Sequence, residues 1–199
     1  MSYHKRARRL AVSFAGIVAL VLLSPAHAAG TGTITGTVRG AGTASETVVY
    51  LVGPAWHGHA GKARMDQHNL HFHPHMMTVV RGTRVEFKNH DHVNHDVFSP
   101  DHEGFKLGIF GFMQHRDHVF DSVGGYSIRC SIHPNMLAYI FVSPNPWAAV
   151  AGESGHFEID GVPAGHWKLE VWNPNAKAAP QAVTVSAGGT TTASVTLSQ

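Results

Sequence analysis

Residues 120–143 read FDSVGGYSIRCSIHPNMLAYIFVS and contain two short runs of alternating or β-branched residues, YSIRC and AYIFV, on either side of a loop. Runs of this kind, bounded by Gly, Pro, Asn or Asp, are typical of β-strands. The loop carries the only cysteine of the chain, Cys130, followed at three-residue intervals by His133 and Met136. The stretch therefore predicts two strands joined by a loop that offers a thiol, an imidazole and a thioether.

The same kind of run recurs along most of the chain. Further examples are TITGTV, TVVYLV, MMTVV, RVEFK, HFEID, WKLEVW, AVTVS and ASVTL, with turn residues between them. Beyond the N-terminal segment, no stretch of helical length shows a 3.6-residue apolar period. The sequence therefore predicts an all-β fold built from β-sandwiches.

The first 28 residues predict a secretory signal peptide. Basic residues come first, then an apolar run at 10–23, then the small-residue site Ala26-His27-Ala28. This order is typical of a signal peptide, here with cleavage after Ala28. The apolar run is short for a membrane span, and no other long run follows. We expect a soluble periplasmic protein with no membrane span once residues 1–28 are removed.

Composition limits the possible partners of the chain and shows that its potential metal ligands are concentrated in the middle. Without residues 1–28 the chain has 11 basic and 13 acidic residues, so its charge gives no indication of binding to nucleic acid or to an anionic membrane. Residues 53–143 hold 13 of the 17 histidines and the single cysteine. That thiol cannot form an intramolecular disulfide, so it is either an inert buried cysteine or a reactive or metal-binding group.

Copper that carries one electron is bound by two imidazoles, one thiolate and a weak axial thioether. Cys130, His133 and Met136 supply three of these four ligands. A structural zinc site built on pairs of thiolates is excluded because there is no second cysteine.

The fourth ligand is expected in the stretch FKNHDHVNHDVFS, residues 87–99. Its candidates are His90, His92 and His95. We expect His95, because it ends the loop between two predicted strands and is therefore best placed to point inward.

Residues 65–143 resemble a cupredoxin of the amicyanin, pseudoazurin and plastocyanin-like kind. The resemblance rests on C-S-I-H-P-N-M at 130–136, on F-x5-Y-x3-C at 120–130, and on V-x-F-x-N at 85–89 followed by His95. It implies a Greek-key β-sandwich that binds one type 1 (blue) copper. The ligands implied are His95, Cys130, His133 and Met136.

The resemblance also implies a hydrogen bond that ties the two ligand loops together, from Asn89 to the neighbourhood of Ser131. The chain departs from the family in Asp96, where asparagine is frequent, and this places a carboxylate close to the metal. The extra imidazoles of His90 and His92 are not part of the family pattern.

A second group of histidines lies at WHGHAG, 56–61, and HNLHFHPHMM, 68–77. On a regular strand His71, His73 and His75 would share one face and could chelate a metal ion. Pro74 interrupts that ladder. The alternative is that these histidines are solvated positions on a β-surface.

The flanks of the chain resemble a carboxypeptidase regulatory-like or transthyretin-like sandwich. The resemblance rests on GESGHFEIDGVPAGHWKLEVWNP at 152–174 and on GTITGTVRG near the start. We therefore expect a cupredoxin domain at 54–146, inserted into a discontinuous sandwich of residues 29–53 and 147–199, with SPNPW at 143–147 as the seam. A competing interpretation gives the strand TVVYLV to the cupredoxin sheet.

Three functions follow from these interpretations. The first is a periplasmic electron carrier whose redox partner docks transiently near His133, as the resemblance implies. The second is a copper-binding or delivery protein that uses the Cys130 site and the histidine-rich segment, and the third is a structural or adhesive protein with a vestigial site. We expect no enzyme, because the four ligands leave no open position on the metal. The sequence does not predict the oligomeric state.

Overall fold

The computed structural model describes residues 30–199, so the predicted signal peptide lies outside the described part of the chain. The prediction of an all-β fold is confirmed, since the regular elements are strands and one short 3-10 turn, η1, at Ala44–Glu46. No helix in the described residues has the length and apolar character needed to cross a membrane.

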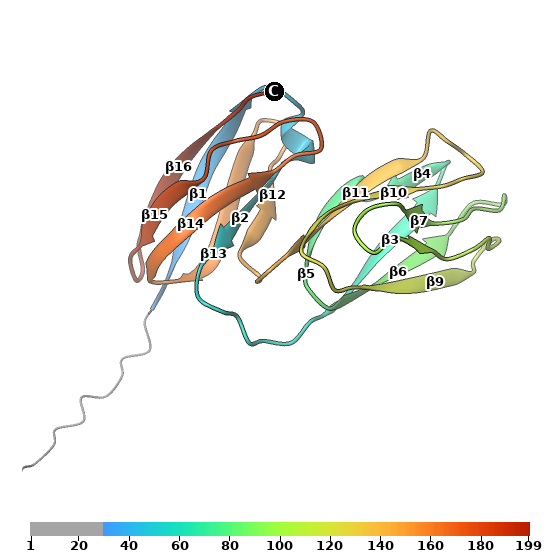
Figure 1. Cartoon of the computed structure of the whole chain (residues 1–199), viewed down its shortest axis with the longest axis horizontal. Coiled ribbons are helices and arrows are strands. Elements are labelled where there is room, and N and C mark those ends of the chain that lie inside the picture. The colour runs from blue at the N-terminus through green and yellow to red at the C-terminus, as the bar shows by residue number, and fades with distance from the viewer. Residues whose placement is uncertain (1–29) are drawn as a thin grey trace, which may run out of the picture.

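Two sheets built from the middle of the chain form one sandwich, here called the central sandwich, on the right in Figure 1. The first has the order β5-β11-β10-β7-β8, with bounds Met76–Val80, Leu137–Ser143, Gly124–Arg129, Phe98–Ser99 and Phe105–Lys106. The second has the order β4-β3-β6-β9, with bounds His71–His73, Lys62–His68, Thr83–Asn89 and His115–Phe120. Inward-facing residues of both sheets, among them Phe87, Phe120 and Tyr126, form one buried core with Cys130 and Met136 of the loop between β10 and β11.

Two further sheets form a flanking sandwich from both ends of the described chain. One has the order β13-β1-β16, with bounds His156–Pro163, Thr31–Gly40 and Thr190–Leu197. The other has the order β12-β2-β14-β15, with bounds Ala148–Val150, Val48–Val52, Gly165–Trp172 and Gln181–Val185. Their core is separate from that of the central sandwich and includes Ile34, Leu51, Phe157, Trp167 and Leu169.

The strand TVVYLV lies in the flanking sandwich. Its regular part, β2, is paired antiparallel with β14 on one side and with β12 on the other. Its inward side chains, Val49 and Leu51, belong to the flanking core. In the described residues β2 is therefore paired with strands of the flanking sandwich and with none of the central sheets.

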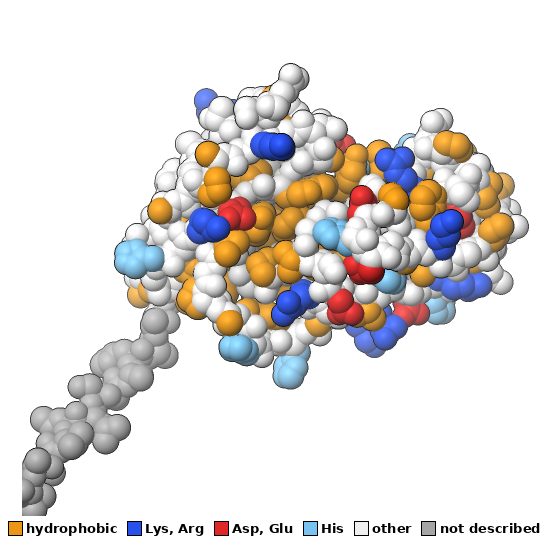
Figure 2. Space-filling view, viewed as in Figure 1, with side chains coloured by type: hydrophobic (Ala, Val, Ile, Leu, Met, Phe, Trp, Pro, Cys, Tyr) orange, Lys and Arg blue, Asp and Glu red, His pale blue; other side chains and the backbone are white. Residues whose placement is uncertain are grey.

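The two sandwiches meet through a small aromatic cluster and a few polar contacts. Phe141 of β11 is 2% exposed and its ring lies 4.7 Å from that of Tyr50 and 5.8 Å from that of Trp172. At the seam, the Asn145 side chain donates to the Leu51 carbonyl. Figure 2 shows hydrophobic side chains gathered over the middle of the visible face, extending toward this junction.

Replacing Phe141 by alanine is expected to lower the free energy of unfolding by about 3–5 kcal/mol, because it leaves a cavity at the contact between the sandwiches. Denaturant unfolding followed by fluorescence measures the change. The matched control is Phe112→Ala, since Phe112 is 47% exposed, and its effect should stay within about 0.5 kcal/mol. Equal losses for the two variants would contradict this account of the junction.

His118 of β9 is enclosed by aromatic rings. Its imidazole stacks on Phe105 with ring centroids 4.0 Å apart and meets Phe120 edge-on at 4.9 Å. Within residues 30–199 its buried Nε2 has no hydrogen-bond partner. Burial lowers the pKa of His118 below its ordinary value.

Because the folded pKa of His118 is lower than the unfolded one, the unfolded chain binds its proton first as the pH falls. His118 should therefore reduce the free energy of unfolding below about pH 6.5, and His118→Phe should make that decline shallower. Urea unfolding between pH 5 and pH 8 tests this, with the same change at exposed His156 as the control. If His118→Phe left the pH dependence of the free energy of unfolding unchanged, the lowered pKa of His118 would not contribute to stability.

Candidate metal centre

Two loops at one end of the central sandwich bring the predicted ligands together. His95 ends the loop that follows β6, and its backbone pairs with Phe110 through two hydrogen bonds of 3.1 and 2.8 Å. Cys130 directly follows β10, and His133 lies in the loop from there to β11. His95 and Cys130 are 0% and 3% exposed, whereas His133 is half-buried. The site is thus closed on the core side and reaches the surface through His133.

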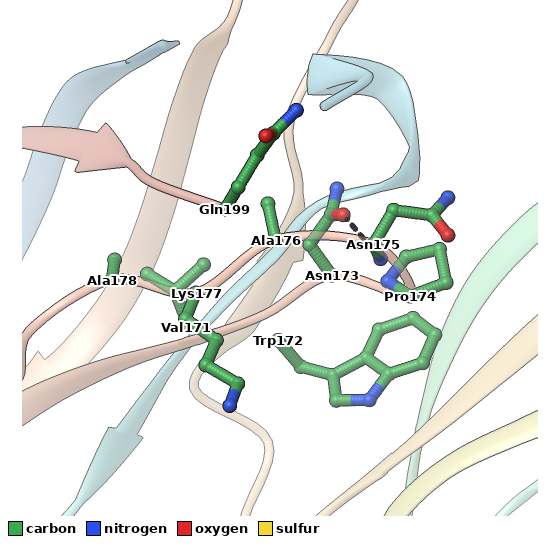
Figure 3. A pocket seen from close by; sticks show the side chains of 9 residues that line it. All are labelled: Val171, Trp172, Asn173, Pro174, Asn175, Ala176, Lys177, Ala178 and Gln199. Carbon is green, nitrogen blue, oxygen red and sulfur yellow. Dashed lines mark hydrogen bonds between the residues drawn. The ribbon is translucent and has the colours of Figure 1, made fainter. Parts of the chain in front are cut away.

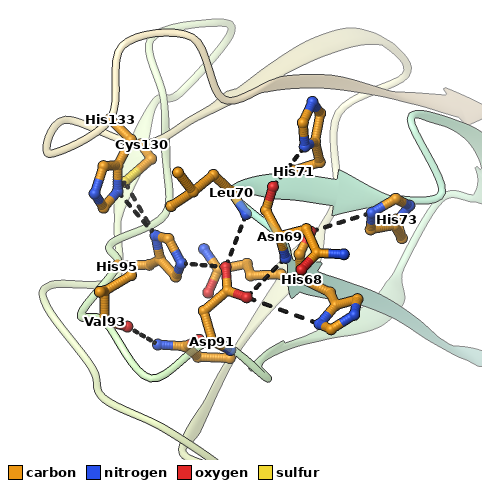
Figure 4. Close-up of polar contacts among 12 residues, drawn as sticks. His68, Asn69, Leu70, His71, His73, Asp91, Val93, His95, Cys130 and His133 are labelled. Atoms are coloured by element: carbon orange, nitrogen blue, oxygen red, sulfur yellow. Dashed lines mark hydrogen bonds and ion pairs between the residues drawn. The ribbon is translucent and has the colours of Figure 1, made fainter.

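Three potential ligand atoms form a near-isosceles triangle (Figure 4). The Nδ1 atoms of His95 and His133 are 3.1 Å apart, and each lies 3.9 Å from the Cys130 Sγ. The point in their plane that is equidistant from all three lies about 2.1 Å from each, close to the 2.0–2.3 Å that imidazole nitrogen and thiolate sulfur keep from a bound transition metal. These residues therefore fit a metal ion without rearrangement.

The second nitrogen of His95 is held by a carboxylate that the sequence did not single out. Nε2 lies 2.9 Å from Asp91 Oδ2. A carboxylate accepts hydrogen bonds, so Nε2 carries the proton and Nδ1 is left with its lone pair toward the triangle. A signal for Asp91 was available in the sequence as a carboxylate four residues before the ligand, but such a spacing is common by chance.

The Asp91 carboxylate also holds a neighbouring turn. Burial alone would raise its pKa, but hydrogen bonds lower the pKa of Asp91 below its ordinary value. The largest of these comes from the Leu70 N–H, followed by those from His95 and from the Asn69 N–H. Asp91 therefore stays ionised beside the imidazole that it orients.

Met136 is buried in the same core as Cys130, with 1% of its surface exposed. Its backbone N–H donates to the carbonyl of His133 at 2.9 Å, which closes the ligand loop into a turn. The loop thus buries a thioether and the thiol in one apolar cluster.

The predicted bond from Asn89 to the Ser131 region is wrong. Asn89 is fully buried and its amide donates instead to the carbonyls of Val93 and Phe110, at 2.8 and 3.2 Å. The two ligand loops are tied by Asp96, whose carboxylate accepts from the Ser131 N–H at 2.6 Å and from its hydroxyl at 2.7 Å. A carboxylate can accept both bonds at once, so Asp96 takes over the linking role.

Asp96 also remains ionised at this position. Burial raises the pKa of its carboxyl, but the stronger combined effect of hydrogen bonds from the Ser131 hydroxyl, the Ser131 N–H and the Cys130 side chain lowers it below the ordinary value. Two carboxylates, Asp91 and Asp96, therefore lie beside the potential ligands.

The other candidate histidines lie outside the triangle. His90 is 3.1 Å from an Arg64 guanidinium nitrogen, and His92 stacks on Phe112 with ring centroids 4.1 Å apart. His75 does not join His71 and His73 on one face, because it turns toward the flanking sandwich and pairs with Glu46 at 2.8 Å.

One surface hollow is lined by none of these residues. It lies on the flanking sandwich, has a volume of about 550 Å³ and is lined in part by Trp172, Asn173 and Pro174 (Figure 3). The Asn173 Oδ1 accepts from the Asn175 N–H at 2.9 Å, and Lys177 is the one ionisable side chain of its lining. Its lining contains no His, Cys, Asp or Glu side chain that could serve as a metal ligand.

Solved structures similar to this chain are copper proteins of the cupredoxin kind. They include a purple cupredoxin from Nitrosopumilus maritimus, 26% identical over 41% of this chain and 99% of that one, with a TM-score of 0.38. Amicyanin from Paracoccus versutus is 19% identical over 41% of this chain and 80% of that one, with a TM-score of 0.39. At these scores the likeness does not establish membership of a family. The search of curated proteins found no match.

One family model matches part of the flanking sandwich. Residues 147–193 match the family described as polysaccharide lyase family 4, domain II. The match covers less than half of the chain, and it is not to the carboxypeptidase regulatory-like or transthyretin-like family. That finer assignment of the flanks stays a prediction.

The expectation that excluded an enzyme is contradicted. A copper-containing nitrite reductase from Thermus scotoductus is also among the similar structures, 24% identical over 54% of this chain and 28% of that one, with a TM-score of 0.39. The exclusion rested on a four-ligand site with no open position, and it is withdrawn.

Changing Asp91 to asparagine is expected to weaken copper binding about 10- to 100-fold, because His95 loses the anionic partner that fixes its tautomer. Competition with a chelator of known affinity measures the change. Asp160→Asn, in the flanking sandwich, is the control and should bind copper as the unaltered protein does. If Asp91→Asn bound copper with unchanged affinity, the Asp91 carboxylate would not be needed to orient His95 for metal binding.

Proposed function

We propose that the chain is a type 1 copper protein that carries single electrons between redox partners in the periplasm. His95, Cys130 and His133 would bind one copper in the equatorial plane and Met136 would bind it axially. The observation that carries the proposal is the triangle of two Nδ1 atoms and one Sγ, with sides of 3.1, 3.9 and 3.9 Å. When bound, copper would supply a Cu(II)/Cu(I) couple at this position.

The donor set favours copper over other ions. One thiolate with two imidazoles and a thioether nearby suits both oxidation states of copper, whereas structural zinc sites use closed tetrahedral sets with paired thiolates. The ligand loops are also cross-tied by Asp96 and Ser131, and His95 is held by Asp91. Ligands whose loops and rings are fixed by such hydrogen bonds keep their positions when the charge of the ion changes. This favours rapid transfer of one electron.

We propose that the redox partner docks around His133. The support is a set of exposed apolar side chains on the loops near the site, here called the apolar rim: Leu70, Val93, Ile109, Phe112, Met113 and Ile132. Their exposed fractions run from 41% for Ile132 to 62% for Ile109. Apolar surface around a half-buried ligand suits a small interface that forms and separates quickly.

The domain limits are part of the proposal. Residues 54–146 would be the copper domain, inserted between residues 29–53 and 147–199, which would act as a scaffold or docking module. Its support is the presence of two separate cores, and the pairing of β1 and β2 with strands that follow residue 147. The periplasmic location rests on the sequence of residues 1–28.

Visible absorption and EPR spectra of the protein with one equivalent of Cu(II) test the proposal. We expect an intense thiolate-to-copper charge-transfer band that is lost in Cys130→Ser and kept in His90→Gln, because only the first change removes the sulfur ligand. A weak imidazole-type spectrum unaffected by Cys130→Ser would contradict the proposed site.

A second candidate function is copper binding and delivery, favoured by the exposed histidines on β3 and β4. Voltammetry and chelator exchange separate the two. A reversible one-electron couple with slow loss of copper supports the electron carrier, whereas rapid transfer of copper to a chelator supports delivery.

A further inference from the structure

The hairpin of β3 and β4 places three histidines on one exposed face. The register pairs His68 with His71 and Asp66 with His73. Directly paired residues of an antiparallel ladder project to the same side, as do residues two apart on one strand. The intervening pair, Gln67 and Phe72, is buried on the opposite side. His68, His71 and His73 therefore share the solvent-facing side of the hairpin.

The His73 ring lies close to each of the other two. His73 is in the middle, with its ring centroid 6.5 Å from that of His68 and 6.2 Å from that of His71. Two imidazoles on one zinc or copper ion, each bound at about 2.0–2.1 Å, have centroids roughly 5 Å apart. The His73 ring would need to approach each of the other two by about 1 Å, and the rings of His68 and His71 would both need to turn toward it, which exposed side chains achieve by rotation.

Backbone carbonyls orient two of these rings (Figure 4). The His71 Nδ1 lies 2.7 Å from the Asn69 carbonyl, and the His73 Nε2 lies 3.3 Å from the His68 carbonyl. A carbonyl only accepts, so the proton of each neutral ring sits on the nitrogen that faces it. The other nitrogen of each ring, Nε2 of His71 and Nδ1 of His73, is left with a free lone pair, which is the arrangement found in metal-binding histidines.

A strained turn holds the hairpin in this register. Asn69 and Leu70 have φ of 52° and 60°, and this left-handed region is unfavourable for leucine. The Asp91 carboxylate offsets the cost by accepting from both turn N–H groups, at 2.7 and 2.9 Å. The same carboxylate lies 3.7 Å from the His68 Nδ1, so the third imidazole is also its neighbour.

We propose that His68, His71 and His73 form a second, surface site for one divalent ion of the zinc and copper kind. Three neutral imidazoles suit these ions, and the exposed position leaves room for water to complete the coordination. The site goes beyond the proposed function, because it uses none of the ligands of the buried centre. Asp91 is its link to that centre, since one carboxylate supports both the hairpin and His95.

The test is calorimetric titration of the full chain with Zn(II), and in parallel with Cu(II), in the presence and absence of Cys130→Ser. The triple variant His68→Gln, His71→Gln, His73→Gln should bind one ion fewer than the unaltered protein in both backgrounds. Each single change should weaken that ion about tenfold or more, since even the loss of an outer partner costs about that much. His156→Gln, an exposed histidine of the flanking sandwich, is the matched control.

Tight binding of either metal that depends on the three residues supports the site, and the ratio of the two affinities identifies the preferred ion. Because the count is made in both backgrounds, a failure of the buried copper site leaves the result interpretable. Binding that is unchanged in the triple variant would overturn the proposal. So would binding only at millimolar metal, or a loss in His156→Gln equal to that in the single variants.

Discussion

A fully buried imidazole must find a partner for each ring nitrogen, and His95 meets this requirement in a way that determines the layout of the site. Its Nε2 donates to Asp91 at 2.9 Å, so its Nδ1 has no proton of its own to donate. That nitrogen faces the His133 Nδ1 at 3.1 Å and the Cys130 Sγ at 3.9 Å. A buried acceptor without a partner is costly, and these two groups are the partners that His95 Nδ1 has; a metal ion between the three atoms would satisfy the same requirement.

The same carboxylate connects this requirement to the rest of the central sandwich. Asp91 accepts from both N–H groups of the Asn69–Leu70 turn, so the hairpin of β3 and β4 is held against the loop that carries His95. Asp96 makes the corresponding connection to the Cys130 loop through Ser131. Asp91 and Asp96 both lie on the loop between β6 and β7, so charged hydrogen bonds tie this one loop to an edge of each sheet, and such bonds are stronger than neutral ones. The site closes one end of the sandwich as well as offering ligands.

The sequence was sufficient for those features that depend on local spacing. The Cys-x2-His-x2-Met loop was visible because all its members lie within seven residues, and the all-β class because the strand pattern recurs throughout the chain. The sequence was insufficient where side chains from different positions of one loop could each bind Ser131 of another loop. Asp96 rather than Asn89 binds Ser131, because the fold turns the Asn89 amide toward Val93 and Phe110.

The histidine-rich segment illustrates the same limit. A regular strand would align His71, His73 and His75, but the chain leaves β4 at His73, and the ring of His75 pairs with Glu46 of the flanking sandwich. Its place is taken by His68, which is three residues from His71 in sequence and directly opposite it across the turn. Cross-strand neighbours follow from the register of the hairpin, and that register depends on Asp91, a residue some twenty positions further along the chain.

Charge around the site acts in two opposing directions. The ionised carboxylates of Asp91 and Asp96 favour the more highly charged form of any cation held by His95, Cys130 and His133, and they act through short hydrogen bonds to the ligand residues or to the residue beside them. Burial beside the apolar core favours the less charged form, because desolvation penalises charge. A site with both influences can hold an ion in two charge states with similar free energy. Hydrogen bonds from Asp91 and Asp96 fix the loops that set this balance. A change in the charge of the ion therefore does not require the ligands to move.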